Sequence, residues 1–307
     1  MTQDPLIYVG GPHSATIDGR VREGGGRVTT NPAAATAIVW LSKDVDDLHM
    51  VLHDRIRWVQ LPDAGVEKWL AAGIIDDTRD FTSAQGCYGL QVAEHALALM
   101  MACLRNLPAY ARARGWDRPE RAGGSLVAGS RVLVVGAGDI GSRFVRMLAA
   151  LGADVTALTR SGRQMPGATS GLAADQLHEV LPTADVVVIC APSTPRTRTL
   201  FGRREFALMK RTAFLINVSR GELVDTAALT EAVRDGIIAG AGLDVVDPEP
   251  LPDHSSLWDL PGVIITPHVA NPAGLKEAAL GNRVRENTER FVTGRELLGL
   301  VRLDRGY

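Results

Sequence analysis

The chain has 307 residues, of which 46% are hydrophobic and 22% charged, a composition that is typical of a globular protein and predicts two domains. Its formal net charge of −2 indicates no broad surface for nucleic acid or another polyanion. The three cysteines are far apart and lack metal-ligand spacing, so we expect reduced core residues and no metal site. The N-terminus lacks the pattern of a signal peptide, and the longest apolar run (96–104) is too short to span a bilayer, so we expect a cytoplasmic protein without a membrane partner.

The first hundred residues predict a small α/β domain. Expected strands are "LIYVGG" (6–11), "AIVWLS" (37–42) and "IRWVQLP" (56–62), and an expected helix is "GVEKWLAAG" (65–73). The apolar run at 90–108 predicts a long helix that bridges two domains. We interpret His95, inside this helix, as a satisfied packing residue; the alternative is a ligand.

From residue 131 onward the sequence predicts a doubly wound α/β domain. Six apolar runs of the kind found in parallel strands buried on both faces recur at 131–136, 154–159, 185–191, 213–219, 238–246 and 262–267. Helical patterns fill most of the gaps, including 140–151 and 225–236. A final amphipathic helix at 275–294 should return to the first domain. The predicted division is therefore 1–98, completed by 274–307, and 99–273.

The first strand of the larger domain leads into a glycine motif. Gly136, Gly138 and Gly141 have the spacing G-x-G-x-x-G between a strand and a helix, with Asp139 and Ile140 inside the motif. Such a loop allows a tight turn, a close approach of a pyrophosphate to the backbone, and a helix N-terminus that attracts phosphate. The alternative is a glycine-rich turn without a ligand.

The second strand of such domains usually ends in an acidic residue that binds the adenosine ribose. Here its tip carries Thr159, Arg160, Ser161 and Arg163 instead. Guanidinium and hydroxyl groups suit a 2′-phosphate, so we expect NADP(H) to be preferred over NAD(H). The alternative is that the arginines belong only to a solvated loop.

Three later strand tips carry residues suited to reducing a 2-oxo acid. Arg220 follows the fourth strand, Asp244 and Glu249 follow the fifth, and His268 follows the sixth. A histidine can supply the proton that the carbonyl oxygen needs, a neighbouring carboxylate can orient it, and an arginine can bind a carboxylate. For His268 alone, a turn histidine is the simpler interpretation. Asp244 suits either the nicotinamide carboxamide or a structural turn.

These blocks, in this order, resemble the D-isomer-specific 2-hydroxyacid dehydrogenases. The resemblance runs from "IRWVQLPDAGVEKW" through "VGAGDIG", "PSTPRTRTL", "LINVSRGELVD", "LDVVDPEPLP" and "LWDLPGVIITPH" to the closing "RLDRGY". It implies a Rossmann dinucleotide-binding domain, a smaller flavodoxin-like substrate domain, and a homodimer formed through the dinucleotide-binding domain. It also implies a catalytic triad of Arg220, Glu249 and His268.

The resemblance further assigns binding residues. Substrate would contact Arg220, His268 and the backbone N–H groups of Ala64 and Gly65. Beyond the glycine motif and the residues 159–163, cofactor contacts would include Pro192, Val218 and Asp244.

The absence of an acidic residue at the end of the second strand is similar to what is found in the NADPH-using glyoxylate and hydroxypyruvate reductases. We therefore expect an NAD(P)-dependent oxidoreductase that reduces a small 2-oxo acid of that kind to the D-2-hydroxy acid. One alternative is an NAD-linked phosphoglycerate dehydrogenase, for which the phosphate would need a basic cluster such as Arg20, Arg22, Arg55 and Arg57. Another is a dinucleotide-binding scaffold similar to the C-terminal-binding corepressors. The sequence does not name the substrate, because one methylene changes binding by only about 1–3 kcal/mol.

Overall fold

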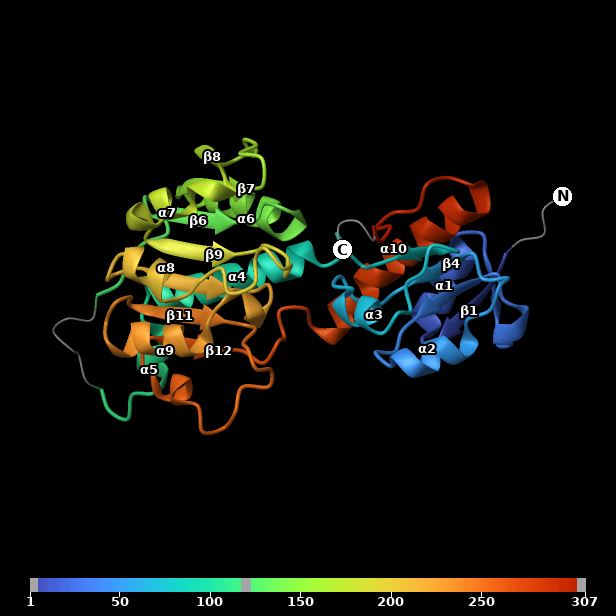
Figure 1. The fold of residues 1–307 in the computed structure, drawn as a ribbon, viewed down its shortest axis with the longest axis horizontal. Coiled ribbons are helices and arrows are strands. Elements are labelled where there is room, and N and C mark those ends of the chain that lie inside the picture. The colour runs from blue at the N-terminus through green and yellow to red at the C-terminus, as the bar shows by residue number, and fades with distance from the viewer. Residues whose placement is uncertain (1–4, 117–122, 303–307) are drawn as a thin grey trace. The chain divides into compact units, whose positions relative to one another are not determined.

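The computed structural model of the protein describes residues 5–116 and 123–302 (Figure 1). The chain forms two compact units, one of residues 1–88 with 272–307 and the other of residues 89–271. The boundary predicted after residue 98 falls inside a helix whose first residue, Gly89, already belongs to the second unit. Residues 303–307 of the closing motif "RLDRGY" lie outside the described residues.

The first unit is a five-stranded parallel sheet in the order β2-β1-β3-β4-β5, the order of flavodoxin-like folds. Its strands are β1 (Leu6–Gly10), β2 (Arg27–Thr29), β3 (Ala37–Trp40), β4 (Trp58–Gln60) and β5 (Asp80–Thr82). Its helices are α1 (Ala15–Glu23), α2 (Val45–Val51), α3 (Glu67–Ala71) and α10 (Ala273–Thr293), with a 3-10 turn at Pro32–Ala34. The sequence patterns did not predict β2 and β5, which have three residues each and lie outside the predicted apolar runs.

The C-terminal helix α10 completes the first unit, although more than 180 residues separate it from β5. Figure 1 shows α10 beside α1, and a Cβ added at Gly24 would lie 2.5 Å from the Arg285 carbonyl oxygen. The glycine therefore lets the end of α1 approach the backbone of α10. Asn287 of α10 also donates from Nδ2 to Gln60 Oε1 (3.1 Å), which fixes the end of β4. Trp58 and Trp69 are both fully buried, and Trp69 belongs to the hydrophobic core of this unit.

The second unit is a seven-stranded, wholly parallel sheet in the order β12-β11-β10-β9-β6-β7-β8. Its strands are β6 (Arg131–Val135), β7 (Asp154–Thr159), β8 (Ser170–Ala173), β9 (Val186–Ile189), β10 (Phe214–Asn217), β11 (Gly240–Leu243) and β12 (Val263–Ile265). Its helices are α4 (Gly89–Leu104), α5 (Leu107–Ala111), α6 (Asp139–Ala150), α7 (Leu177–Val180), α8 (Arg203–Leu208) and α9 (Thr226–Arg234), and 3-10 turns lie at Ala174–Gln176, Leu181–Thr183, Gly221–Leu223 and Ser256–Asp259. The sheet confirms the predicted α/β class; only β8 has no counterpart among the predicted strands.

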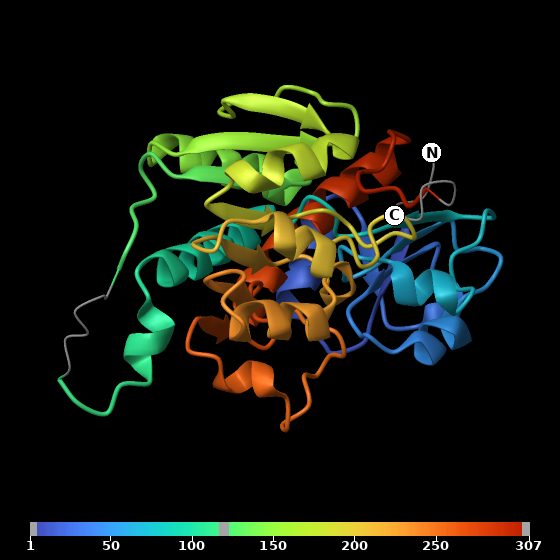
Figure 2. The same cartoon turned by 60° about the vertical axis from the view of Figure 1, so that its left-hand side comes forward.

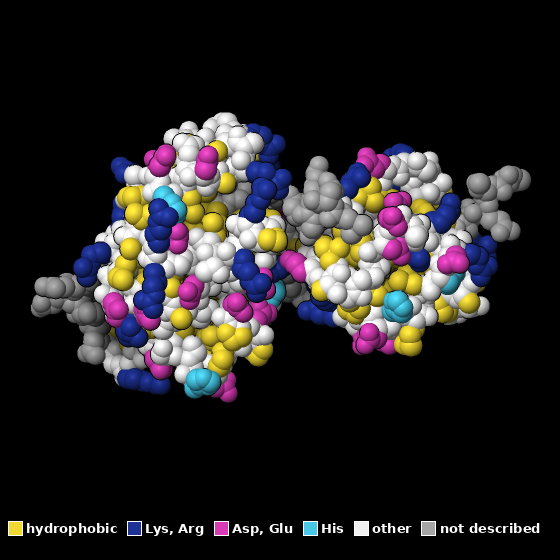
Figure 3. Space-filling view, in the orientation of Figure 1, with side chains coloured by type: hydrophobic (Ala, Val, Ile, Leu, Met, Phe, Trp, Pro, Cys, Tyr) yellow, Lys and Arg dark blue, Asp and Glu magenta, His cyan; other side chains and the backbone are white. Residues whose placement is uncertain are grey.

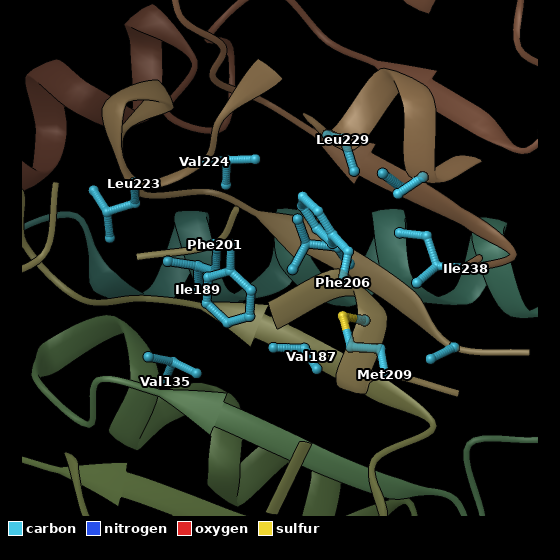
Figure 4. Close-up of a cluster of buried hydrophobic side chains, with 14 of the residues drawn as sticks. Val135, Val187, Ile189, Phe201, Phe206, Met209, Leu223, Val224, Leu229 and Ile238 are labelled. Atoms are coloured by element: carbon cyan, nitrogen blue, oxygen red, sulfur yellow. The ribbon is translucent and has the colours of Figure 1, made fainter. Parts of the chain in front are cut away.

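The core on one face of this sheet explains the continuous apolar runs. Figure 4 shows Val135, Val187 and Ile189 of the strands facing Phe201 and Phe206. All five side chains are at most 4% exposed. Burial of each large apolar side chain contributes about 1.5–3 kcal/mol, so both faces of a central strand select apolar residues.

Helix α4 covers the other face of the sheet. A Cβ added at Gly242 of β11 would lie 3.0 Å from the Cβ of Leu99, so this glycine lets α4 pack closely on the strand. The helix ends at Leu104, earlier than predicted, because Asn106 adopts a left-handed φ of 54° and Pro108 lies in the first turn of α5. Within the described ranges, no helix combines the length and apolar character needed to cross a bilayer.

Candidate active site

The predicted site residues of the second unit follow the carboxyl ends of its strands. Because all seven strands are parallel, these ends form one edge of the sheet, where open α/β sheets bind ligands. The edge carries Gly136–Gly141 after β6, Thr159–Arg163 after β7, Pro192 after β9, Val218 and Arg220 after β10, Asp244 and Glu249 after β11, and His268 after β12. Val218 is buried and Pro192 is exposed.

The three glycines of the loop between β6 and α6 differ in the space beside them. A Cβ at Gly136 would lie 2.6 Å from Ala191, and one at Gly141 would lie 2.1 Å from the Gly136 carbonyl oxygen. A Cβ at Gly138 would meet nothing within 4 Å. Two glycines therefore close the turn, and the third leaves open space above the helix N-terminus.

The N-terminus of α6 also offers unused donors. In the described part of the chain, no hydrogen bond uses the N–H groups of Gly138, Asp139 or Ile140. Arg143 Nε donates to Asp139 Oδ1 (2.8 Å), which balances the negative charge beside this terminus. Free N–H groups and a positive helix end are what a pyrophosphate needs, so these residues fit a dinucleotide.

The loop after β7 is tied back to the end of the strand. The Arg163 N–H donates to Thr159 Oγ1 (2.9 Å), and Gly162 turns the chain with a φ of 69°. Arg160, Ser161 and Arg163 are exposed. Figure 3 shows Lys and Arg side chains gathered over the loop that joins β7 to β8.

His268 and Glu249 form a hydrogen-bonded pair. The distance from His268 Nδ1 to Glu249 Oε1 is 2.7 Å, and the two side chains are 51% and 46% exposed. The bond directs Nδ1 toward the carboxylate and leaves Nε2 without a hydrogen bond among the described residues. Because the pair is half exposed, it adds little to stability, about 0–1 kcal/mol. It fixes the orientation of the imidazole ring.

A buried carboxylate shapes the turn that carries His268. Asp244 is 2% exposed; its Oδ1 accepts from Thr266 Oγ1 (2.6 Å) and the Val269 N–H (2.9 Å), and its Oδ2 accepts from the Ala270 N–H (3.1 Å). Burial raises the pKa of Asp244, but hydrogen bonds from His95, Thr266 and the two N–H groups outweigh it, so the pKa lies below its usual value. The predicted contact of Asp244 with a nicotinamide carboxamide stays a prediction.

The backbone of His268 itself is strained. Its φ is 53°, in the left-handed region that costs a residue other than glycine about 1–3 kcal/mol. Its N–H donates to the Asp244 carbonyl oxygen (2.9 Å). The bonds to Asp244 on both sides of the turn therefore hold His268 in a conformation that it would not adopt alone.

The loop with Arg220 approaches the segment that leads to Glu249. A Cβ added at Gly221 would lie 1.9 Å from the Val246 carbonyl oxygen, so only glycine allows this contact. The Asn217 side chain donates to the Arg220 carbonyl oxygen (2.9 Å) and fixes the loop. The guanidinium of Arg220 donates to the Ser219 carbonyl oxygen (2.8 Å). These contacts bring the loops of the three predicted catalytic residues next to one another.

His95 is hydrogen-bonded inside the second unit, as expected of a satisfied residue, and its partners belong to the strand ends that carry the predicted site. Its Nε2 lies 2.9 Å from Thr266 Oγ1 and 3.4 Å from Asp244 Oδ1. The sequence did not reveal these two partners of His95, because they lie about 150 and 170 residues away along the chain.

In the first unit, Ala64 and Gly65 lie in the loop after β4. No hydrogen bond in the described ranges uses their N–H groups, so both can donate to a ligand. The neighbouring Asp63 is bound by Lys68 (3.0 Å) and Lys276 (3.1 Å). Burial raises the pKa of Asp63, but the two lysines outweigh it and lower the pKa. The clamp ties the loop to α3 and α10.

The basic residues considered for a phosphate group lie elsewhere in this unit. Arg55 and Arg57 precede β4, at the amino end of the strand whose carboxyl end carries Ala64 and Gly65. Arg57 lies over the Phe291 ring, 4.9 Å from its centre. Arg20 and Arg22 belong to α1, where they pair with Glu23 and Asp18. They do not form one cluster at the substrate loop. Across the described residues, no group of three or more His, Cys, Asp or Glu side chains could hold a metal ion.

Comparison with known proteins decides the family. A family model described as "D-isomer specific 2-hydroxyacid dehydrogenase, NAD binding domain" matches residues 97–270. The chain belongs to the D-isomer-specific 2-hydroxyacid dehydrogenases. As a member of this family, it is an NAD(P)-dependent oxidoreductase that acts on CH–OH donors, which confirms the expected enzyme class. The roles of its individual site residues remain predictions.

Several D-2-hydroxyacid dehydrogenases and related proteins are similar over most of the chain. An uncharacterized protein from Corynebacterium melassecola is 33% identical over 305 residues, 98% of this chain and 100% of that protein. The structure of a D-isomer specific 2-hydroxyacid dehydrogenase from Xanthobacter autotrophicus Py2, in complex with NADPH and MES, has a TM-score of 0.85 and 27% identity and covers 99% of this chain and 100% of that chain.

An NADPH-dependent glyoxylate/hydroxypyruvate reductase from Sinorhizobium meliloti, in complex with NADP and sulfate, has a TM-score of 0.82 and 27% identity over 99% of this chain and 100% of that chain. The D-3-phosphoglycerate dehydrogenase of Methanocaldococcus jannaschii is 33% identical over 216 residues, 69% of this chain. The match spans only 41% of that enzyme's length.

Proposed function

We propose that the protein reduces a small 2-oxo acid of the glyoxylate or hydroxypyruvate kind to the D-2-hydroxy acid, with NADPH as the preferred reductant. The observation that carries the proposal is the 2.7 Å pair of His268 and Glu249 at the sheet edge that also carries the glycine loop. The same residues would catalyse the reverse oxidation.

His268 acts as the acid and base. Glu249 accepts from Nδ1–H, which leaves Nε2 to hold the proton that passes to the carbonyl oxygen of the substrate. When bound, the reduced nicotinamide supplies the hydride to the carbonyl carbon. In the oxidation direction, Nε2 accepts the proton from the hydroxyl group.

The family resemblance assigns substrate contacts to Arg220 of the second unit and to the backbone N–H groups of Ala64 and Gly65 of the first unit. A guanidinium presents paired N–H donors to a carboxylate or a carbonyl oxygen, and the N–H groups of Ala64 and Gly65 are unused in the described structure. Pro192, Val218 and Asp244 complete the cofactor site as the family resemblance implies. These assignments make a small α-keto carboxylate the substrate class.

The preference for NADPH rests on the loop after β7. No carboxylate lies among residues 159–163, and two exposed arginines do. The related enzymes from Xanthobacter and Sinorhizobium are in complex with NADPH and NADP, respectively. Replacing Arg163 by alanine should raise the KM for NADPH by about tenfold, the effect of losing one charge-assisted hydrogen bond, and should leave the KM for NADH unchanged. A wild-type enzyme that prefers NADH would refute the preference.

The decisive experiment combines a substrate panel with one substitution. Glyoxylate, hydroxypyruvate, pyruvate and phosphohydroxypyruvate are each tested with both reduced nicotinamides. His268→Ala should lower turnover of the best substrate by about 10²–10⁴-fold. His178→Ala serves as the control, because His178 pairs with Glu205 away from the predicted site residues. If phosphohydroxypyruvate with NADH were the best pair, the enzyme would be of the phosphoglycerate type; if no oxo acid were turned over, a scaffold function would remain.

We also propose that the protein is a homodimer formed through its dinucleotide-binding unit. Helix α5 follows the end of α4 in Figure 2, and Arg112 at its C-terminal end donates to the Val263 carbonyl oxygen of β12 (3.2 Å). Leu107, Tyr110 and Trp116 in this region are 52%, 41% and 89% exposed, which is unusual for apolar side chains so close together. Sedimentation analysis of the wild type and of Leu107→Glu tests the proposal. A monomeric wild type would refute it.

A further inference from the structure

His95 occupies a place from which it can act on the candidate acid–base histidine. It lies on α4, and its Nε2 is 2.9 Å from Thr266 Oγ1 and 3.4 Å from Asp244 Oδ1. Thr266 is two residues before His268, and Asp244 follows the neighbouring strand β11. The His95 side chain is only 22% exposed, so it joins two elements that the sequence places far apart.

The direction of the hydrogen bonds is fixed by chemistry. Thr266 Oγ1 lies 2.6 Å from the ionised Asp244 Oδ1, which can only accept, so the Thr266 hydroxyl donates. The threonine oxygen then accepts from Nε2–H of His95. The result is a chain of donors from His95 through Thr266 to Asp244. Nε2 carries a hydrogen both in one neutral tautomer and in the imidazolium, so the chain does not require a charged His95.

The Asp244 carboxylate links the hydrogen bonds of His95 and Thr266 to the turn around His268. Besides Thr266, it accepts from the N–H groups of Val269 and Ala270, the two residues that follow His268. The turn is therefore held on both sides of a residue whose φ is 53°.

Helix α4 is a firm support for this arrangement. Leu99 follows His95 by one helical turn and packs against Gly242 of β11, two residues before Asp244. The helix and the strand are therefore in close contact one helical turn beyond His95.

We propose that His95 is a positioning residue, which aims the imidazole of His268 by fixing the 266–270 turn through Thr266 and Asp244. The inference rests on the proposed function, in which His268 transfers the proton. His95 itself need not touch the substrate or the cofactor. A displacement of the acid by about 1 Å can cost about 10²-fold in rate, so its effect should appear in the chemical step.

Two substitutions separate positioning from packing. His95→Leu keeps the apolar bulk and removes the donor, and His95→Gln keeps a donor near the position of Nε2. We expect His95→Leu to lower kcat by about 10–100-fold, with the KM values for the oxo acid and NADPH changed by less than about threefold. His95→Gln should recover most of kcat. The deuterium isotope effect on kcat, with the transferred hydride labelled, should rise in His95→Leu because the chemical step has slowed. His178→Leu is the control and should leave kcat unchanged.

A second measurement does not depend on turnover. Hydrogen–deuterium exchange of the peptide covering residues 263–271 should be faster in His95→Leu than in the wild type and His178→Leu, because the Val269 and Ala270 N–H groups lose a firmly held acceptor. Unchanged exchange together with unchanged kcat would overturn the inference, and so would equal losses in the leucine and glutamine variants. A wild type that reduces no oxo acid but shows the faster exchange in His95→Leu would refute the proposed function while the link from His95 to the turn stands.

Discussion

For the substitution Asp244→Asn, the structure predicts the change in stability, its dependence on pH and a fall in turnover. The carboxylate accepts three hydrogen bonds from the turn, two on Oδ1 and one on Oδ2. An amide has one oxygen and one donating nitrogen. In its better orientation the oxygen replaces Oδ1, and the amide nitrogen then faces the Ala270 N–H. One hydrogen bond is lost, and the others lose the assistance of the charge.

The expected cost follows from these contacts. Hydrogen bonds to charged groups contribute about 1.5–3 kcal/mol each, and a buried unsatisfied donor costs about 1–3 kcal/mol, so we expect a loss of about 2–4 kcal/mol of unfolding free energy. A domain of the size of Gly89–Asn271 shifts in Tm by roughly 2–4 °C per kcal/mol, which gives a decrease of about 4–16 °C at pH 7. Turnover should also fall, because the turn carries His268.

The stability difference should depend on pH in a defined direction. The folded-state pKa of Asp244 is lowered, so the ionised group stabilises the fold above the unfolded-state pKa of about 3.9. This contribution is lost as the pH falls through the folded-state value. The difference between wild type and variant should therefore be constant from about pH 5 to pH 8 and should narrow below about pH 4.

Differential scanning calorimetry at several pH values measures this difference. Asp253→Asn is the matched control, since Asp253 is exposed in the loop after β11, and it should change stability by less than about 0.5 kcal/mol. A Tm decrease of less than about 2 °C for Asp244→Asn at pH 7 would show that the carboxylate is not the acceptor that organises the turn. A difference that widened toward acid pH would contradict the direction of the pKa shift.

Three further predictions concern the cofactor loop, the histidine pair and a cysteine. Gly141→Ala should weaken dinucleotide binding by at least about tenfold in a fluorescence titration, because the new Cβ would lie 2.1 Å from the Gly136 carbonyl oxygen and would distort the loop; unchanged affinity would contradict the close packing. Glu249→Gln should change Tm by less than about 3 °C, because the pair of Glu249 with His268 is half exposed. It should lower kcat by about tenfold or more in steady-state assays. A large loss of stability with full activity would show that Glu249 has a structural and not a catalytic role. Burial raises the pKa of the Cys190 thiol to about 12, so mass spectrometry should find it unalkylated by iodoacetamide at pH 8 until the protein is denatured; rapid labelling of the native enzyme would show the thiol to be accessible.

The elements predicted from sequence are those whose signal is local. The run 154–159 matches β7 in both of its ends, because a strand buried on two faces selects apolar residues throughout. The helical pattern predicted at 225–236 begins at the observed start of α9, where the Asp225 side chain accepts from the Ala228 N–H (2.9 Å). The short strands β2, β5 and β8 were missed, because pairing with a neighbouring strand defines them and their own residues do not.

Among the features of the candidate site, too, those with a local sequence signal were predicted. Spacing was enough to find the glycine loop, and position at strand ends was enough to select Arg220, Glu249 and His268. The end of the bridging helix was not predicted: the apolar run continues to residue 108, but the helix ends at Leu104, before the left-handed Asn106.

The sequence by itself determined the α/β class, the glycine loop and the identity of the residues at the strand tips, because each depends on neighbours within a few positions along the chain. Only the tertiary structure decided that Glu249 contacts His268, that Gly221 admits the backbone of Val246, and that His95 reaches the turn of His268 through Thr266 and Asp244. The physical reason is that hydrogen bonds and close contacts require atoms about 3 Å apart. Residues separated by 19 to 171 positions reach that distance only after the sheet has formed and the helices have packed on it.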